Sequence, residues 1–227
     1  MFSKVRKHLE TRPLVMVATV CARQLWPETA TCIISVLNSP QYRAFSLFHR
    51  GSVIHLARNT VAKAFLAHPN KPDYLLFVDD DMVFKHDALE KLLADHKDIV
   101  TGNAFSRQYP VKPVVGMFDT DPAKKGRVHV LLDYKKDALQ PVDSCGMAFT
   151  LISRHALEKV GPKPFGFLFF PETDGELHED SSFCWRAKEA GLQVWLDSRV
   201  QVGHIGDVVF DERDFEAGKE ELIKLMK

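Results

Sequence analysis

The sequence lacks the features that assign a chain quickly to several large classes of protein. Its four cysteines form no C-x-x-C pair and no spacing typical of a zinc finger: Cys21, Cys32, Cys145 and Cys184. Isolated cysteines in a chain of 227 residues are typical of reduced, mostly buried thiols, so we expect a cytoplasmic protein. No apolar run approaches the ~20 residues of a membrane span, and we therefore expect no stable membrane insertion.

An excess of either charge is also absent. The 30 Lys and Arg residues balance 30 Asp and Glu residues, which leaves no overall field for attracting nucleic acid. With 45% hydrophobic and 26% charged residues, the composition is that of an ordinary globular protein. Internal repeats and low-complexity linkers are lacking as well, so we interpret residues 1–227 as a single domain.

The N-terminal stretch mimics a signal peptide, because a basic segment at residues 1–12 precedes an apolar one. The apolar run is only about ten residues long and rich in valine, and a helical pattern follows it at once. A first buried strand at residues 14–20 accounts for these features, and we favour it over a cleaved signal.

Strand and helix patterns alternate along the first hundred residues. Apolar runs predict strands at 14–20, 43–49 and 74–78, and helical periodicity predicts helices at 27–37, 52–69 and 88–94. Further on we expect strands at 146–152, 193–197 and 199–206, helices at 153–160 and 180–190, and an amphipathic tail from residue 212. Short alternating stretches within 105–143 suggest antiparallel strands, and 164–177 is expected to be an irregular loop that closes as a lid. The pattern predicts an α/β fold, Rossmann-like, with a mostly parallel sheet, helices on both faces and a small antiparallel addition.

The stretch LLFVDDDMVF places Asp79, Asp80 and Asp81 directly after a predicted buried strand. Burying unpaired carboxylates is costly, so we expect something to compensate them. Residues i and i+2 of a strand point to the same side, so Asp79 and Asp81 are expected to converge on one divalent cation while Asp80 points elsewhere. Oxygen ligands favour Mg²⁺ or Mn²⁺, and an added imidazole favours Mn²⁺. The alternative is an acidic turn that caps the following helix.

Four motifs occur in an order that resembles the GT-A glycosyltransferases, especially the family 2-like group. They are HLARNTVAKAFL (55–66), VDDD (78–81), HEDSSFCWRAKEAGLQVWLD (178–197) and VGHIG (202–206), and the resemblance covers residues 13–206. It implies a GT-A fold with a nucleotide-sugar-binding half at about 13–104, an acceptor and metal half at about 105–206, and a C-terminal helical tail at 207–227. The Q-x-x-R-W motif of processive polysaccharide synthases is missing, so a membrane synthase is not expected.

The resemblance implies transfer of a sugar from a nucleotide-diphosphate sugar, with a UDP-sugar favoured, to an acceptor hydroxyl. Mn²⁺ or Mg²⁺ would stabilise the departing diphosphate, held by Asp79, Asp81 and His204. For His204, packing in a turn is the alternative. The acceptor stays open among a glycan, a lipid, a protein and a modified DNA base, and so does the choice between inversion and retention.

The resemblance also implies roles for residues that bind the donor and act on the acceptor. Asp180, with Glu179 beside it, would be the base that deprotonates the acceptor hydroxyl, with helix capping as the alternative role of Asp180. The donor would contact residues at the sheet edge and on the helix before the D-x-D strand: Thr19 and Arg23 at the base, Asp79 or Asp80 at the ribose, Arg58 at the diphosphate and Gly146 at the sugar. For Arg58, an ordinary surface charge is the alternative.

Three other functions fit parts of the sequence. Residues 79–83 match the D-x-D-x-[TV] string of haloacid-dehalogenase-type phosphatases, in which Asp79 would be a nucleophile, but we find no second motif of the G-D-x-x-x-D type. A nucleotidyltransferase would want a glycine-rich loop after the first strand, and residues 17–27 contain no glycine. A non-catalytic module that binds a sugar or nucleotide is the last alternative, and it leaves Glu179, Asp180 and His204 unexplained.

Overall fold

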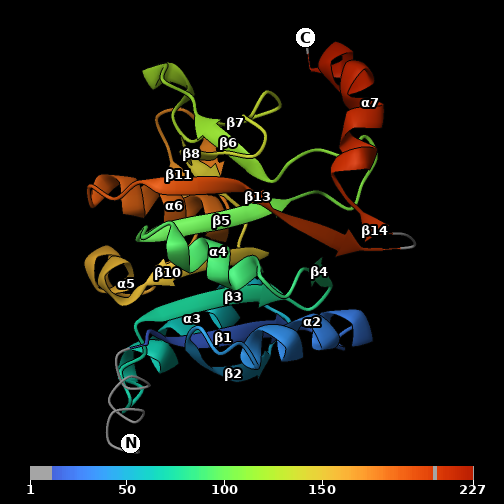
Figure 1. The fold of residues 1–227 in the computed structure, drawn as a ribbon. Helices are drawn as coiled ribbons and strands as arrows, with labels where there is room; N and C mark the ends of the chain where they lie inside the picture. Colours follow the sequence, from blue (N-terminus) through green and yellow to red (C-terminus); the bar gives the residue numbers. More distant parts are fainter. Residues whose placement is uncertain (1–11, 207–208, 227) are drawn as a thin grey trace, which may run out of the picture.

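A mixed sheet runs through the centre of the molecule in the computed structural model, which describes residues 12–206 and 209–226 (Figure 1). Its main path has the strand order β2-β1-β3-β10-β5-β13-β14. Five strands of this path run in one direction: β1 (Leu14–Cys21), β2 (Arg43–Arg50), β3 (Tyr74–Asp79), β5 (Ile99–Ala104) and β13 (Val194–Ile205). β10 (Phe149–Ser153) lies antiparallel between β3 and β5. The prediction of an α/β fold with a mostly parallel sheet is confirmed.

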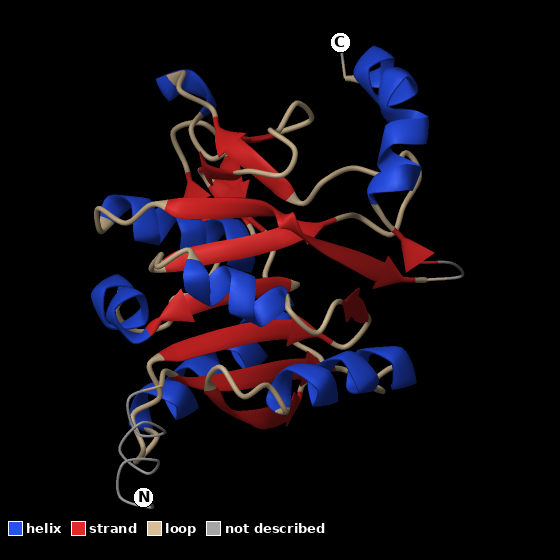
Figure 2. Cartoon of the chain, in the orientation of Figure 1, coloured by secondary structure: helices blue, strands red, loops and turns tan. Residues whose placement is uncertain are grey.

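Helices cover both faces of this sheet, as predicted (Figure 2). One face carries α2 (Pro27–Leu37) and α4 (Ala88–Ala94), and the other carries α3 (Ile54–Ala67), α5 (Arg154–Val160) and α6 (Glu179–Glu189). Each strand contributes side chains to both faces of the sheet, because successive side chains of a strand point to opposite faces. In β1, Val15 and Val17 pack toward α2, whereas Met16 and Ala18 pack toward α3. This two-sided burial explains why the strand is an unbroken apolar run.

Short antiparallel strands form the predicted addition. β4 (Met82–Phe84), β8 (Leu139–Val142) and β14 (Val209–Phe210) each pair with β13. β6 (Val115–Phe118), β7 (Val128–Val130) and β9 (Ser144–Cys145) form a separate sheet, with the short helix η1 (Pro122–Lys124) between β6 and β7. β11 (Leu168–Phe170) and β12 (Gly175–Leu177) form a hairpin, so the expectation of an irregular segment at 164–177 was wrong for these six residues. Strands of three residues are too short to give a readable alternation.

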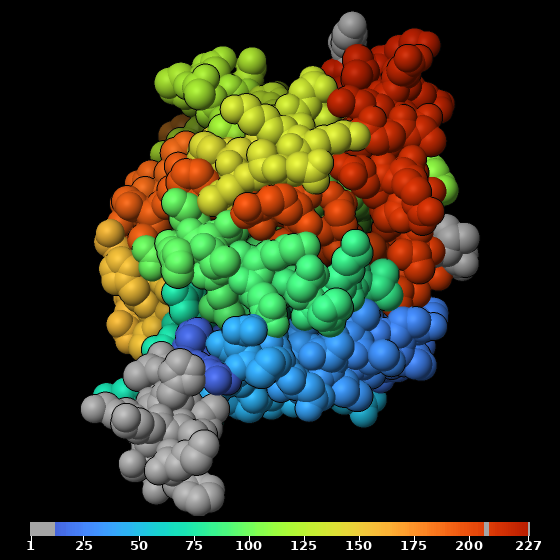
Figure 3. Space-filling view, in the orientation of Figure 1, coloured from blue at the N-terminus to red at the C-terminus, as the bar shows by residue number. Residues whose placement is uncertain are grey.

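The C-terminal helix α7 (Glu212–Leu225) packs on the main body through one aromatic anchor. Phe215 is fully buried, with its ring centroid 5.9 Å from Phe105 and 6.1 Å from Tyr134. Asp211 and Asp214 form a capping box that fixes the start of the helix. Figure 3 shows α7 in red against the yellow-green segment that contains Tyr134. The amphipathic tail was therefore predicted correctly over its described part.

Two predictions about the ends of the chain concern residues that are not all described. Residues 1–11, which make up most of the basic segment of the signal-like stretch, lie outside the described residues. Residues 207–208 and 227 of the predicted tail lie outside them as well. Over residues 12–206 and 209–226, helices long and apolar enough to cross a membrane are absent.

Candidate functional site

The predicted site residues gather at one edge of the central sheet. Because β1, β3, β5 and β13 are parallel, their carboxyl ends lie together, at the right in Figure 1. Asp79 ends β3, and His204 is the penultimate residue of β13. Gly146 enters the same edge because it precedes β10, which runs the opposite way. Ligands bind outside the carboxyl ends of strands in open α/β sheets, so this edge is the candidate site.

A buried arginine ties β3 to α6. Arg58 of α3 is only 4% exposed. Its Nη2 donates to both Asp79 oxygens, at 3.1 and 3.3 Å, and its Nη1 donates to Glu179 Oε1 at 2.7 Å. Burial lowers the pKa of Arg58, but the neighbouring Asp79, Glu179 and Asp180 carboxylates outweigh burial, and the net shift of its pKa is upward. Arg58 is therefore a fixed cation that joins two acidic motifs, not a surface charge.

Asp81 and His204 face one another across the end of the sheet. His204 Nε2 lies 3.2 Å from Asp81 Oδ1, and both side chains are mostly buried. His204 Nδ1 lies 2.8 Å from the Phe105 carbonyl oxygen. A carbonyl oxygen only accepts, so Nδ1 carries the hydrogen of this bond and Nε2 is directed at Asp81. Metal-binding histidines are commonly oriented by such a bond from the second ring nitrogen.

The backbone explains why Asp79 and Asp81 do not converge as expected. β3 ends at Asp79, Asp80 and Asp81 form a turn, and β4 then pairs with β13, with Met82 opposite His204. The alternation of a strand does not extend through a turn, so Asp79 faces Arg58 while Asp81 faces His204. Within the described part of the chain, no group of three or more His, Cys, Asp or Glu side chains could hold a metal ion. The structure thus brings together two of the three predicted ligands.

Asp81 and His204 fit a divalent cation that a substrate completes. Adjacent ligands of an octahedral ion at ~2.1 Å are about 3 Å apart, and the observed separation of 3.2 Å is close to this. Mg²⁺ is usually bound through one or two carboxylates, several waters and the phosphates of a substrate. Two protein ligands therefore suffice for a cation that arrives with a phosphorylated ligand.

Asp80 points away from its two neighbours, as expected, toward the turn between β1 and α2. Its carbonyl oxygen accepts from Trp26 N at 3.0 Å, and its carboxylate interacts with the Cys21 thiol. Burial raises the pKa of Asp80, the charges of Asp81 and Asp79 add to this rise, and the Cys21 hydrogen bond opposes it. Burial also raises the pKa of Cys21, with Asp80 adding to the rise.

The two predicted residues on the β1 side differ in access. Thr19 is 1% exposed, and its Oγ1 has no hydrogen-bond partner among the described residues. Arg23 is exposed in the turn that follows β1. Arg23 is thus accessible to solvent, whereas the Thr19 hydroxyl is buried. Both roles in donor binding stay predictions.

The first turn of α6 holds two acidic side chains with different surroundings. Glu179 is 8% exposed and bound to Arg58, and its pKa is raised by burial and by Asp180, with Arg58 opposing the rise. Asp180 is only partly buried, and its Oδ1 accepts from Ser181 N at 2.7 Å. The N-cap is His178, so Asp180 does not hold the capping position.

Gly146 lies directly opposite Asp180. A Cβ added at Gly146 would lie 3.8 Å from Asp180 Oδ2. The backbone before β10 thus passes beside the carboxylate that remains accessible, and the predicted sugar-side residue and the predicted base share one wall of the site.

Arg107 and the carbonyl group of Phe105 belong to the site but were not predicted from the sequence. Arg107 Nη1 lies 2.7 Å from Asp81 Oδ2, although the Arg107 side chain is 53% exposed. Both residues come within three positions of the end of β5. Inspecting the residues that follow every predicted parallel strand, not only the D-x-D strand, would have found them.

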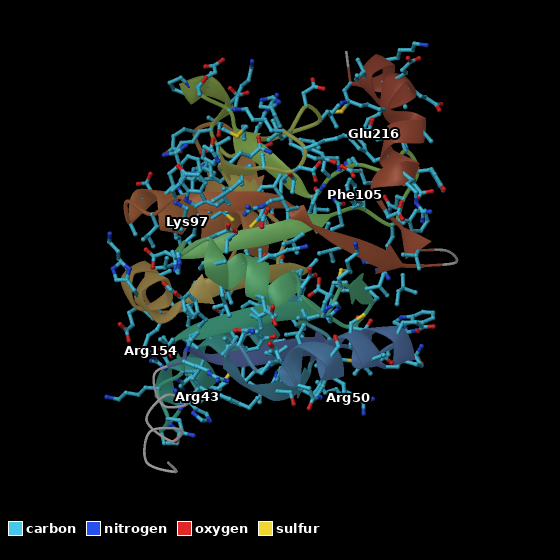
Figure 4. All side chains as sticks on the ribbon, viewed as in Figure 1. Arg43, Arg50, Lys97, Phe105, Arg154 and Glu216 are labelled. Carbon is cyan, nitrogen blue, oxygen red and sulfur yellow. The ribbon has the colours of Figure 1, made fainter. Side chains whose placement is uncertain are left out.

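A hollow lies at the opposite edge of the sheet. It has a volume of about 590 Å³, and its lining includes Arg43, Asp98, Arg154 and His155. Figure 4 shows Arg43 and Arg154 far from Phe105, which marks the candidate site. The Arg154 guanidinium donates hydrogen bonds to three carbonyl oxygens at the end of α3 and just beyond it, those of Phe65, Leu66 and Pro72. Arg154 thus has a structural role, and we take the edge with Asp81 as the candidate site because the predicted site residues gather there.

Comparison with known proteins supports the fold alone. No protein-family model matches the chain, and no curated protein matches it. Among solved structures, the chain is similar to the crystal structure of A197 from STIV, with a TM-score of 0.53, 19% sequence identity and 86% of each chain covered. The similarity spans most of both chains, which agrees with one α/β architecture throughout.

Proposed function

We propose that this protein is a metal-dependent glycosyltransferase of the GT-A type, which moves a sugar from a nucleotide-diphosphate sugar to an acceptor hydroxyl. The observation that carries the proposal is the Asp81–His204 pair. The imidazole ring of His204 is oriented by the Phe105 carbonyl oxygen. The pair lies at the edge where an open α/β sheet binds ligands. The acidic motif of α6 is tied to the same edge through Arg58.

In this proposal Asp81 and His204 hold Mn²⁺ or Mg²⁺ together with the donor's diphosphate. The cation would stabilise the charge that develops on the departing nucleoside diphosphate. Arg58 keeps Asp79 and Glu179 in place, and Asp79 or Asp80 contacts the ribose. Thr19 and Arg23 border the nucleobase, for which uracil is favoured.

Asp180 is the proposed general base toward the acceptor hydroxyl. It is the more accessible of the two acidic residues in the first turn of α6, because Glu179 is buried against Arg58. A general base typically contributes a factor of about 10²–10⁴ to the rate. Glu179 then acts as a positioning residue, and Gly146 lines the sugar pocket. The acceptor is left open among a glycan, a lipid, a protein and a modified DNA base.

The alternatives are less well supported by the same geometry. A phosphatase would need Asp79 as a free nucleophile, yet both Asp79 oxygens accept from Arg58. A nucleotidyltransferase would want glycine-rich backbone in the turn after β1, and residues 22–26 contain no glycine. A non-catalytic binding module would bind a nucleotide at the same site. An assay of turnover distinguishes it from a glycosyltransferase, whereas a binding assay does not.

Calorimetry with UDP, GDP, ADP and dTDP, each in Mn²⁺ or EDTA, tests the binding that the proposal requires. We expect one nucleotide to bind in Mn²⁺ and to bind at least about tenfold more weakly in EDTA, since the cation bridges its phosphates to the protein. Asp81→Asn should remove the dependence on Mn²⁺ without changing the circular dichroism spectrum. Equal affinity in Mn²⁺ and EDTA, or no binding of any nucleotide, would contradict the proposal.

A further inference from the structure

Arg107 occupies one side of the carboxylate that the proposed function assigns to the cation. Asp81 Oδ1 faces His204 Nε2 at 3.2 Å, and Asp81 Oδ2 faces Arg107 Nη1 at 2.7 Å. A mostly buried carboxylate at the edge of a sheet needs a positive partner, and in this structure the guanidinium provides it.

The two arginines of the site differ in how firmly they are held. Arg58 is 4% exposed and bound by two carboxylates from two elements. Arg107 is 53% exposed and bound to Asp81 alone among the described residues. Arg107 is thus held at one point only, and it can leave Asp81 when another cation takes its place, because Asp81 then keeps the positive partner that its burial requires.

The backbone that carries Arg107 is anchored next to the site. Phe105 forms a β-bridge with Pro113, and Ser106 N donates to the Lys112 carbonyl oxygen at 2.9 Å. The residues from 106 to 112 thus form a closed loop whose base includes the carbonyl group that orients His204. The guanidinium can leave Asp81 by rotation of its own side chain, without movement of the His204 support.

We propose, building on the proposed function, that Arg107 takes the place of the cation on Asp81 in the ligand-free protein and moves to the donor's diphosphate when the cation binds. A dication and a guanidinium on the same carboxylate repel one another. A diphosphate beside Asp81 offers the released guanidinium a better partner, because the planar guanidinium pairs well with phosphate oxygens. Arg107 therefore weakens binding of the cation alone and strengthens binding of the cation with a diphosphate.

The test compares wild type, Arg107→Gln and Arg127→Gln in two binding assays. Arg127 is an exposed arginine in the turn between η1 and β7, so its loss removes the same charge away from Asp81. The first assay titrates Mn²⁺ alone and follows free Mn²⁺ by electron paramagnetic resonance. The second measures radiolabelled pyrophosphate by equilibrium dialysis in saturating Mn²⁺.

We expect opposite changes in the two assays. Arg107→Gln should bind Mn²⁺ alone about fivefold or more tightly, because Mn²⁺ no longer has to displace a guanidinium from Asp81, and should bind pyrophosphate about fivefold or more weakly. Arg127→Gln should match wild type in both. Unchanged or weaker Mn²⁺ binding by Arg107→Gln would overturn the inference.

Asp81→Asn separates this inference from the proposed function. If Asp81→Asn loses Mn²⁺ binding while Arg107→Gln shows no opposite changes, the cation site stands and only the role of Arg107 is wrong. If Asp81→Asn binds Mn²⁺ as wild type does, or if wild type binds none, the cation site fails and the inference fails with it.

Discussion

At the scale of single residues, the site is organised by which carboxylate meets which cation. Three consecutive aspartates have three different surroundings: Asp79 meets Arg58, Asp80 meets the Cys21 thiol, and Asp81 meets His204 and Arg107. The repulsion among adjacent carboxylates is reduced because a turn directs them apart. Only Asp81 is left beside an imidazole suited to a cation.

Arg58→Met should destabilise the protein, because it leaves Asp79 and Glu179 without their partner. Breaking a buried charge pair costs ~3 kcal/mol or more. The free energy of unfolding, measured with urea, should fall by about this amount, and nucleotide binding should weaken as Asp79 moves. Arg127→Gln is the control and should change stability by less than about 0.5 kcal/mol. Equal stability of Arg58→Met and wild type would show that Arg58 is only a surface charge.

Asp180→Asn should lower turnover and leave donor binding intact. Loss of a general base reduces the rate by about 10²–10⁴, while the amide keeps the size of the carboxylate. Steady-state kinetics with the accepted donor and acceptor measures the rate, and calorimetry measures nucleotide affinity. Glu179→Gln provides the comparison, since a positioning residue should cost less in rate. Turnover by Asp180→Asn at the wild-type rate would exclude Asp180 as the base.

The stability of the protein should depend on pH through Glu179. Burial and Asp180 raise the pKa of Glu179 in the folded state, against the opposing effect of Arg58. The folded state therefore binds this proton more tightly, and the stabilisation is lost as pH rises from the ordinary glutamate pKa of about 4.3 through the raised value.

Glu179→Gln has no such proton and isolates this effect. The free energy of unfolding of wild type minus that of Glu179→Gln should fall as pH rises across this window. Urea unfolding of both proteins at a series of pH values from about 4 to 7 measures the difference. A difference that rises with pH would mean that Arg58 controls the pKa of Glu179 and that burial does not.

At the scale of elements, β13 and α7 support the site from outside the D-x-D strand. β13 carries His204 and pairs with β5, β4, β8 and β14. α7 buries Phe215 against Phe105, and the Phe105 carbonyl oxygen holds His204. The C-terminal helix thus contacts the same residue that orients the proposed metal ligand.

Phe215→Ala should cost ~3–5 kcal/mol in the free energy of unfolding, because it leaves a cavity beside Phe105 and Tyr134. Because Phe105 loses a packing partner, Mn²⁺ affinity should also decrease. Leu225→Ala, at a position 68% exposed on the same helix, is the matched control and should change neither quantity. Chemical unfolding and Mn²⁺ titration make the comparison. A stability equal to that of the control would show that α7 is not packed as described.

The sequence predicted elements best where one periodicity persists. The predicted helices at 27–37 and 88–94 have the observed bounds of α2 and α4. The two strands expected at 193–197 and 199–206 are one strand, β13, with a register shift after Asp197. Asp197 and Ser198 look like a break in the sequence, yet both are fully buried, paired with Arg199 and with backbone near Ala138. The Ser198 bonds depend on a segment 60 residues away, which periodicity does not reveal.

Asp81 and His204 of the candidate site could be predicted from the sequence, but the pairings within the site could not. Asp81 was predicted from the D-x-D motif and His204 from the resemblance, and parallel strand order brings the carboxyl ends of β3, β5 and β13 to one edge. The separation of Asp79 from Asp81 depends on β3 ending at Asp79, and element boundaries are the least certain part of sequence reading. Arg107 was missed because its loop carries no motif.

At the scale of the whole molecule, the fold places the proposed cation site, the acidic motif of α6 and an exposed arginine at one edge of the sheet. At the opposite edge, Arg154 of the hollow is bound to carbonyl oxygens at and just beyond the end of α3, which is a structural role. The similarity to A197 from STIV covers 86% of both chains and concerns the architecture. Because the similarity concerns only the architecture, the proposed sugar transfer is tested by experiments on this protein itself.

The most direct measurement is the release of nucleoside diphosphate from UDP-, GDP-, ADP- and dTDP-sugars by wild type and by Asp81→Asn. Each protein is assayed with Mn²⁺, Mg²⁺ or EDTA. A mixture of glycan, lipid, protein and hydroxylated-DNA acceptors is present throughout. We expect metal-dependent release from one donor by wild type and none above background by Asp81→Asn. Equal release by both proteins, or Mg²⁺-dependent cleavage of a simple phosphomonoester in place of any nucleotide sugar, would contradict the proposed function.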